Sequence, residues 1–225
     1  MSDKSPLFTV STYNTAHKNA WNQFILQAKN ATFLFHRDFM EYHEDRFEDA
    51  SLLVFKKEKL IAVLPANKTG DAIISHQGLS YGGLVISNKA KLEDSLQAFK
   101  AILQFLVQEK VEKLQLKVIP RIYHTQPADE MDYLLFLTEA TRTRVDVSAT
   151  IRSRDAIKIQ GNRMEGVKKA EKQGLYLETG KDFNLFWNWI LIPNLKQRHG
   201  AKPVHTLDEI ELLAARFPKN ITQFN

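Results

Sequence analysis

The 225-residue sequence contains no cysteine. Disulfides, thiolate metal sites and a cysteine nucleophile are therefore excluded, and a reducing compartment is favoured. Long hydrophobic runs are also missing, since the longest, 60–66, falls far below the roughly 20 residues that span a bilayer. The opening Met-Ser-Asp-Lys-Ser-Pro lacks the apolar core of a signal peptide. These absences predict a cytoplasmic protein without a membrane span.

Several catalytic and metal-binding motifs are absent as well. There is neither a Walker phosphate loop nor the Gly-x-Ser-x-Gly elbow of serine hydrolases. The histidine pairs His36/His43 and His199/His205 lack the i, i+4 spacing of a helical zinc site, so no metal site is predicted. We interpret the carboxylates within 41–49 as an exposed, charge-compensated helix face.

The formal net charge is +5, from 31 basic and 26 acidic residues. Such a small excess fits simple solubility, and it is also compatible with an anionic ligand such as a nucleotide-bearing acyl donor. Basic residues are enriched in 110–121 and 142–172, but no RNA-binding motif or zinc-finger spacing accompanies them. Dedicated binding to DNA is therefore not expected.

Hydrophobic periodicity predicts a mixed α/β (α+β) fold for the first part of the chain. Apolar stripes predict helices at 15–29, 91–109 and 129–140, whereas alternation and turn signals predict strands at 7–10, 51–55, 60–66, 71–75, 84–86, 114–119 and 144–151. Hairpins combined with long crossovers favour one mixed, mostly antiparallel sheet flanked by helices on both faces.

The character of the sequence changes after Ile151. A basic helix at 162–173 is expected to end at Gly174, which suits a left-handed C-cap. A strand at 175–178, a helix capped by Asp182 and split by Pro193, a helix opened by the capping box 206–209 and a strand start at 221–224 follow. This order repeats the start of the chain, so we predict two related lobes, 1–155 and 156–225, the second incomplete.

One segment stands out as a candidate binding site, namely His76-Gln77-Gly78-Leu79-Ser80-Tyr81-Gly82-Gly83. Its glycines allow close backbone approach or positive φ values. We predict that His76, Gln77 and Tyr81 point toward a concave site that the missing glycine side chains leave open. A glycine bulge that joins two strands, with His76 and Gln77 solvated, is the alternative.

The basic helix is a second candidate site. Arg163, Lys168, Lys169 and Lys172 surround it, and they form either a solvated face or a phosphate-binding face.

Several segments together resemble the Fem-like (FemAB-type) acyltransferases of the GNAT superfamily. They are Trp21 with 31–37, 47–52, the stretch from 64–66 to 75–83, 117–123 and 169–174. The resemblance implies two GNAT-like lobes and transfer of an acyl group from acyl-CoA, or from aminoacyl-tRNA, to an amine. The acceptor would be a small molecule, an amino sugar or a cell-wall precursor. It adds Arg121 and Tyr123 to the substrate-binding residues and leaves the catalytic residue unidentified.

The sequence departs from the family at the donor site. The Gln/Arg-x-x-Gly-x-Gly/Ala pattern that holds the donor pyrophosphate is missing, and the corresponding junction of the second lobe would lie beyond Asn225. We therefore predict weak or no acyl-CoA binding, no tightly bound cofactor, and self-association through uncovered apolar faces. A noncatalytic GNAT-like binding or assembly domain remains the alternative function.

Overall fold

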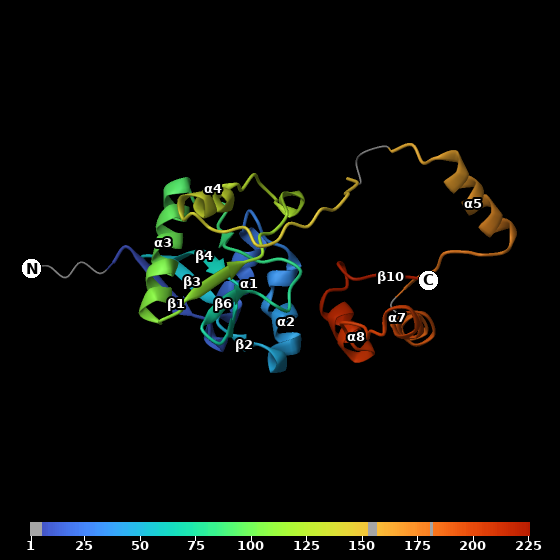
Figure 1. The fold of residues 1–225 in the computed structure, drawn as a ribbon, viewed down its shortest axis with the longest axis horizontal. Helices are drawn as coiled ribbons and strands as arrows, with labels where there is room; N and C mark the ends of the chain where they lie inside the picture. The colour runs from blue at the N-terminus through green and yellow to red at the C-terminus, as the bar shows by residue number, and fades with distance from the viewer. Residues whose placement is uncertain (1–5, 153–156, 181) are drawn as a thin grey trace, which may run out of the picture. The chain divides into compact units, whose positions relative to one another are not determined.

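The structure, a computed structural model, describes residues 6–152, 157–180 and 182–225. The chain forms two compact units, Met1–Ala140 and Thr141–Asn225, called here the first and second unit (Figure 1). The predicted lobe boundary between 155 and 156 falls outside the described residues and stays a prediction. Within those described ranges, no helix has the length and apolarity needed to cross a bilayer.

The first unit contains two four-stranded sheets. One has the order β1 (Phe8–Thr12), β3 (Leu52–Lys56), β4 (Lys59–Leu64), β7 (Val85–Ile86), and all its pairs are antiparallel. The other has the order β2 (Glu48–Asp49), β5 (Asn67–Thr69), β6 (Ala72–Ser75), β8 (Lys113–Leu116), with β6 and β8 parallel. The mixed, mostly antiparallel α/β architecture is therefore confirmed, but the prediction of one sheet is wrong.

A single bent ribbon connects the two sheets. Strands β2 and β3 follow one another in sequence and run beside β4 and β5, and the pairing is interrupted around Ser51 and Ala66. There the Ser51 hydroxyl accepts a hydrogen bond from the Ala66 N–H (3.1 Å), while the Ala66 carbonyl accepts one from the Ala50 N–H (3.0 Å). Pro65 has no backbone N–H group, so it cannot donate a hydrogen bond between the strands. The ribbon changes sheets at this point.

Helices cover the strands on both faces. Helix α3 (Leu92–Gln108) and helix α4 (Glu130–Leu137) share one core cluster with Leu52, Val54 and Leu64. Because side chains alternate along a strand, the buried Leu53 belongs to the opposite face. Figure 1 shows α1 (Lys18–Gln27) and α2 (Arg37–Met40) on the side of the strands away from α3. The predicted flanking helices are thus confirmed.

The strand predicted at 144–151 is not formed. Residues 141–152 have no regular secondary structure, and Val147 is 95% exposed. The sequence alternates as a strand does, yet no described strand lies beside it to complete a ladder, and alternation without a partner does not hold an extended segment. This prediction was wrong.

The second unit is mostly helical. Its elements are α5 (Gly161–Lys172), β9 (Thr179–Gly180), α6 (Phe183–Leu185), the π-helical segment Phe186–Leu191, α7 (Ile192–His199), α8 (Leu207–Arg216) and β10 (Gln223–Phe224). The predicted signals hold: Gly174 has φ +75°, the Asp182 carboxylate caps α6, and Thr206 and Glu209 form a capping box. The strand predicted at 175–178 is not formed; the two-residue strand β9 follows directly after it and pairs antiparallel with β10.

Candidate functional site

The segment 76–83 carries the chain from one sheet to the other. Strand β6 pairs with β8 in parallel, whereas β7, which follows the segment, pairs with β4 in the other sheet. A parallel bridge between Gly82 and Val118 holds the segment to the continuation of β8. The segment and the chain after β8 therefore lie side by side where β6 and β7 change sheets.

The glycines of this segment are needed for close packing. A Cβ on Gly82 would lie 2.0 Å from the Ser75 carbonyl oxygen, and one on Gly78 would lie 2.1 Å from Nε2 of His43. Protein atoms thus fill the space that the missing side chains leave. At Gly78 and Gly82 the expectation of an open, concave site is corrected, because these two glycines let the His43 ring and the Ser75 backbone approach.

His76 and His43 form a buried, stacked pair. Their ring centroids are 5.7 Å apart with an interplanar angle of 18°, and the Phe47 ring stands on edge against both. Nδ1 of His76 accepts a hydrogen bond from the Gly78 N–H (3.2 Å). Burial, with the neighbouring His43, lowers the pKa of His76 from 6.5 to about 4, and burial also lowers the pKa of His43. Both rings are neutral at pH 7.

This depressed pKa predicts a loss of stability in mild acid. The unfolded chain binds the His76 proton near pH 6.5 and the folded chain only near pH 4, so stability is full above 6.5 and is lost as the pH falls toward 4. The complete effect is about 3 kcal/mol, of which about 2 kcal/mol is lost by pH 5. Urea unfolding measures it in a Trp187→Phe, Trp189→Phe background, where Trp21 is the one remaining tryptophan.

His76→Gln should remove this part of the pH dependence between pH 7.5 and pH 5. His199→Gln is the matched control, because His199 is an exposed residue of the second unit, and it should retain the wild-type pH dependence. An unchanged pH dependence in His76→Gln would show that another group is responsible.

Gln77 is exposed and held by its neighbours. Its Oε1 accepts hydrogen bonds from the Asn67 amide (2.8 Å) and the Thr69 hydroxyl (3.0 Å), and its N–H donates to Oδ1 of Asn67 (2.7 Å). These bonds fix the start of the segment on β5.

The structure brings together two of the predicted substrate-binding residues, Tyr81 and Tyr123. Their ring centroids are 5.2 Å apart, and the Tyr81 hydroxyl lies 2.9 Å from the Thr32 hydroxyl. Arg121, on the same short turn as Tyr123, forms ion pairs with Asp129 (2.9 Å) and Asp132. The Arg121 side chain is therefore oriented toward the start of α4, whereas the Tyr123 ring lies against Tyr81.

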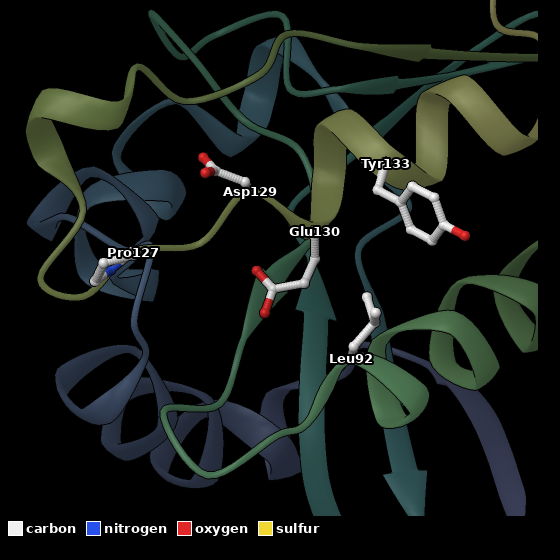
Figure 2. Close-up of a pocket in the computed structure, with 5 residues that line it drawn as sticks. All are labelled: Leu92, Pro127, Asp129, Glu130 and Tyr133. Carbon is white, nitrogen blue, oxygen red and sulfur yellow. The ribbon is translucent and has the colours of Figure 1, made fainter.

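A shallow, open pocket of about 330 Å³ lies at that start (Figure 2). Its surface is mostly apolar. Five residues line it: Leu92, Pro127, Asp129, Glu130 and Tyr133. Figure 2 shows the Glu130 carboxylate projecting from α4 into the space between Pro127 and Leu92. The buried Lys29 pairs with Oε1 of Glu130.

Sequence reasoning missed this pocket. Lys29 and Glu130 are 101 residues apart, and each resembles an ordinary charged residue at a helix end. A lysine directly after an amphipathic helix and followed by Asn30 carries no recognisable signal. Only the tertiary pairing reveals that Lys29 is buried.

The outer edge of β7 is occupied by the residues that follow α1. The Lys29 N–H donates to the Ile86 carbonyl (3.0 Å), and Ala28 forms an antiparallel bridge with Ser87. The Asn30 side chain continues the ladder, since its Oδ1 accepts from the Ile86 N–H and its Nδ2 donates to the Leu84 carbonyl, both at 2.8 Å. Strand β7 is therefore hydrogen-bonded on both edges.

The N–H groups of the turn between β7 and α3 donate hydrogen bonds to acceptors in the turn itself and in the first turn of α3. The N–H groups of Lys89 and Ala90 donate to Ser87, and the Lys91 N–H donates to the Asp94 carboxylate (3.1 Å). The hydrogen bond from Lys56 holds the pKa of Asp94 below its ordinary value, so this carboxylate is ionised at the helix N-terminus. The N-terminus of α3 therefore already carries an anion of its own, the Asp94 carboxylate.

The remaining candidates lie on α5. Arg163, Lys168 and Lys169 are exposed, and within the described ranges no ion pair engages them. The described residues also contain no group of three histidine, aspartate or glutamate side chains placed to hold a metal ion.

Comparison of the sequence with protein-family models and with curated proteins finds no match. Solved structures that resemble the fold include the aminoglycoside N-acetyltransferase AAC(6')-Iy in complex with CoA, at 10% identity and a TM-score of 0.38, covering 69% of this chain and 100% of that one. The ribosomal-protein-S18-alanine N-acetyltransferase from Escherichia coli is 12% identical with a TM-score of 0.36, over 48% of this chain and 64% of that one.

A third, the aminoglycoside 6'-N-acetyltransferase AAC(6')-IG from Acinetobacter haemolyticus, is 10% identical with a TM-score of 0.36, over 65% of this chain and 99% of that one. The chain thus spans less than two thirds of the Escherichia coli protein. TM-scores this low do not by themselves establish a shared fold.

Proposed function

We propose that the chain belongs to an N-acyltransferase of the GNAT type, which moves an acyl group from acyl-CoA to an amine. The observation that carries this proposal is the parallel pair β6–β8 among otherwise antiparallel strands, with β7 leaving for the other sheet. The segments 64–83 and 117–123, which resemble the Fem-like acyltransferases, lie side by side here, through the pairing of β6 with β8 and the bridge between Gly82 and Val118. As a Fem-like member, the protein would acylate a small molecule, an amino sugar or a cell-wall precursor.

The first unit is proposed to serve the acceptor side of this transfer. An acyl-CoA donor needs free backbone N–H groups at a helix N-terminus for its pyrophosphate. The turn before α3 instead bonds its N–H groups internally and carries Asp94. Lys29 and Asn30 close the adjacent edge of β7. Both features disfavour a donor in the first unit.

Acetyl-CoA is accordingly expected to leave β7 and the start of α3 unchanged. Hydrogen–deuterium exchange of the full chain, with and without about 1 mM acetyl-CoA, should show no added protection over 84–95, consistent with a dissociation constant weaker than about 1 mM there. Protection in that range, or a tight stoichiometric complex that protects it, would place the donor in the first unit and overturn this assignment.

Release of coenzyme A tests the activity itself. A thiol reagent reports it without background, because the chain has no cysteine. Amine-dependent release of coenzyme A supports the transferase. Its absence across a panel that includes glucosamine and lysine would favour the second candidate, a noncatalytic GNAT-like binding or assembly domain, which the closed β7 edge also favours.

A further inference from the structure

Strands β1, β7, β2 and β8 lie at the ends of the two sheets of the first unit, and the last three are protected against further pairing. Strand β7 is closed by the residues that follow α1. Strand β2 has only two residues, both acidic, and β8 begins with Lys113 and is followed by Lys117. Short length and charged side chains, lysine above all, are common means by which an edge strand avoids pairing with another chain.

Strand β1 has none of these protections. Its five residues, Phe8-Thr9-Val10-Ser11-Thr12, include no charged residue and no proline. Its pairing with β3 continues through all five positions without a bulge, and within the described part of the chain it pairs with no other strand. An uncharged, regular edge of this length is therefore open to an added strand.

The ladder with β3 determines which backbone groups of β1 point outward. The Leu7 carbonyl accepts a hydrogen bond from the residue after β3, and the Tyr13 N–H donates one to the residue before it, both at 2.8 Å. Because bonded positions alternate along an antiparallel ladder, Thr9 and Ser11 bond to β3 as well. The N–H and C=O groups that point to the outer edge are those of Phe8, Val10 and Thr12. Among the described residues, none is hydrogen-bonded to them.

These outward groups are complementary to themselves. In an antiparallel pairing of two β1 strands about a two-fold axis at Val10, Val10 lies opposite Val10 of the second copy, and Phe8 lies opposite Thr12 of the second copy. Each opposed pair exchanges both of its hydrogen bonds, because all of these residues have their backbone groups on the outer edge. The side-chain pairs are β-branched with β-branched and aromatic with β-branched, which favour a sheet, and no like charges meet.

We infer that β1 is the interface through which two copies of this chain form a two-fold dimer. The sheet that contains β1 joins its copy into one continuous sheet, and both copies use the same surface, as in other two-fold dimers. One strand on each side covers less than the roughly 800 Å² per partner of a stable interface. The dimer is therefore weak, with a dissociation constant between about 10 µM and 1 mM. This inference does not depend on the proposed function.

Amide hydrogen exchange of the full chain, resolved by NMR, tests the register. The N–H groups of Thr9 and Ser11 should be protected at every protein concentration, since β3 accepts their hydrogen bonds. Between about 20 µM and 1 mM protein, exchange at Phe8, Val10 and Thr12 should slow by about two- to sixfold, the change in the monomer fraction for such a dimer. Exchange at these three positions that does not depend on concentration would overturn the inference.

A proline variant tests the interface itself. Thr12→Pro removes an outward N–H group that the single copy does not use, and proline is tolerated in an edge strand at such a position. The monomer should keep its fold, while sedimentation equilibrium should show an association constant at least about tenfold lower, because each copy loses a donor and the ring obstructs the pairing. Thr12→Val keeps the N–H group and is the matched control, so it should associate like the wild type.

Undiminished association of a folded Thr12→Pro protein would refute the pairing and assign self-association to another surface, such as the apolar faces of the second unit. Trp21 fluorescence, in the Trp187→Phe, Trp189→Phe background, reports whether the variant folds. If it does not fold, the concentration dependence of exchange in the wild type still decides the question. Acyl transfer is read separately by coenzyme A release.

Discussion

Arg37→Met is expected to destabilise the first unit by about 3–5 kcal/mol, the usual cost of removing one partner from a buried ion pair. The Arg37 side chain is 3% exposed, and its guanidinium lies 3.5 Å from the centroid of the Tyr13 ring. It pairs with Glu41 (3.1 Å) and with Asp49, and it donates to the Ser51 hydroxyl (3.3 Å). Methionine fills part of the volume, but it removes the Arg37 cation from Asp49 and leaves Glu41 with Lys18 alone.

Lys18→Met is the matched control for this prediction. Lys18 pairs with Asp38 (2.8 Å) and Glu41 (2.7 Å), but its side chain is 37% exposed. Exposed ion pairs contribute at most about 1 kcal/mol, so its loss should be small. Urea unfolding followed by Trp21 fluorescence, in the Trp187→Phe, Trp189→Phe background, measures both variants. Equal losses would mean that burial of Arg37 does not determine its contribution.

Gly82→Ala is expected to cost about 4 kcal/mol or more, in the range that marks a severe packing defect. Its new methyl group would lie 2.0 Å from the Ser75 carbonyl oxygen and 2.7 Å from the carbonyl carbon. Both are backbone atoms at the end of β6, so relief requires the strand or the bridge from Gly82 to Val118 to move. The same unfolding measurement applies.

Gly70→Ala provides the comparison. Gly70 has φ +60°, and no neighbouring atom lies within 4 Å of the position that its new methyl group would take, so only backbone strain of about 1 kcal/mol is expected. If the two alanine variants lost similar stability, the close contact with the Ser75 backbone would not have the cost expected of it.

Features that depend on local sequence could be predicted. The apolar stripe of α3 and the capping box at Thr206 each specify an element within a few neighbouring residues, and both agree with the structure. The hairpin β3–β4 was equally evident from its two apolar runs and polar turn.

Features that depend on distant pairing could not be predicted. The division into two sheets depends on how Ser51 and Ala66 bond across the ribbon, which alternation does not encode. The segment 144–151 shows the converse case, because it has the pattern of a strand and no described partner. At the site, the glycine-rich segment suggested Tyr81 and the resemblance suggested Tyr123, whereas the pairing of Lys29 with Glu130 exists only in three dimensions.

The bent ribbon also has a consequence for the order of folding. Strands β3 and β4 are joined by a two-residue turn, so their contacts close a short loop at small entropic cost. The parallel pair β6–β8 encloses α3 and requires a much longer loop. Contacts of low sequence separation form fastest. The ribbon is therefore the natural early structure, and since it extends into both sheets, it gives each of them a first pair of strands on which the later ones assemble.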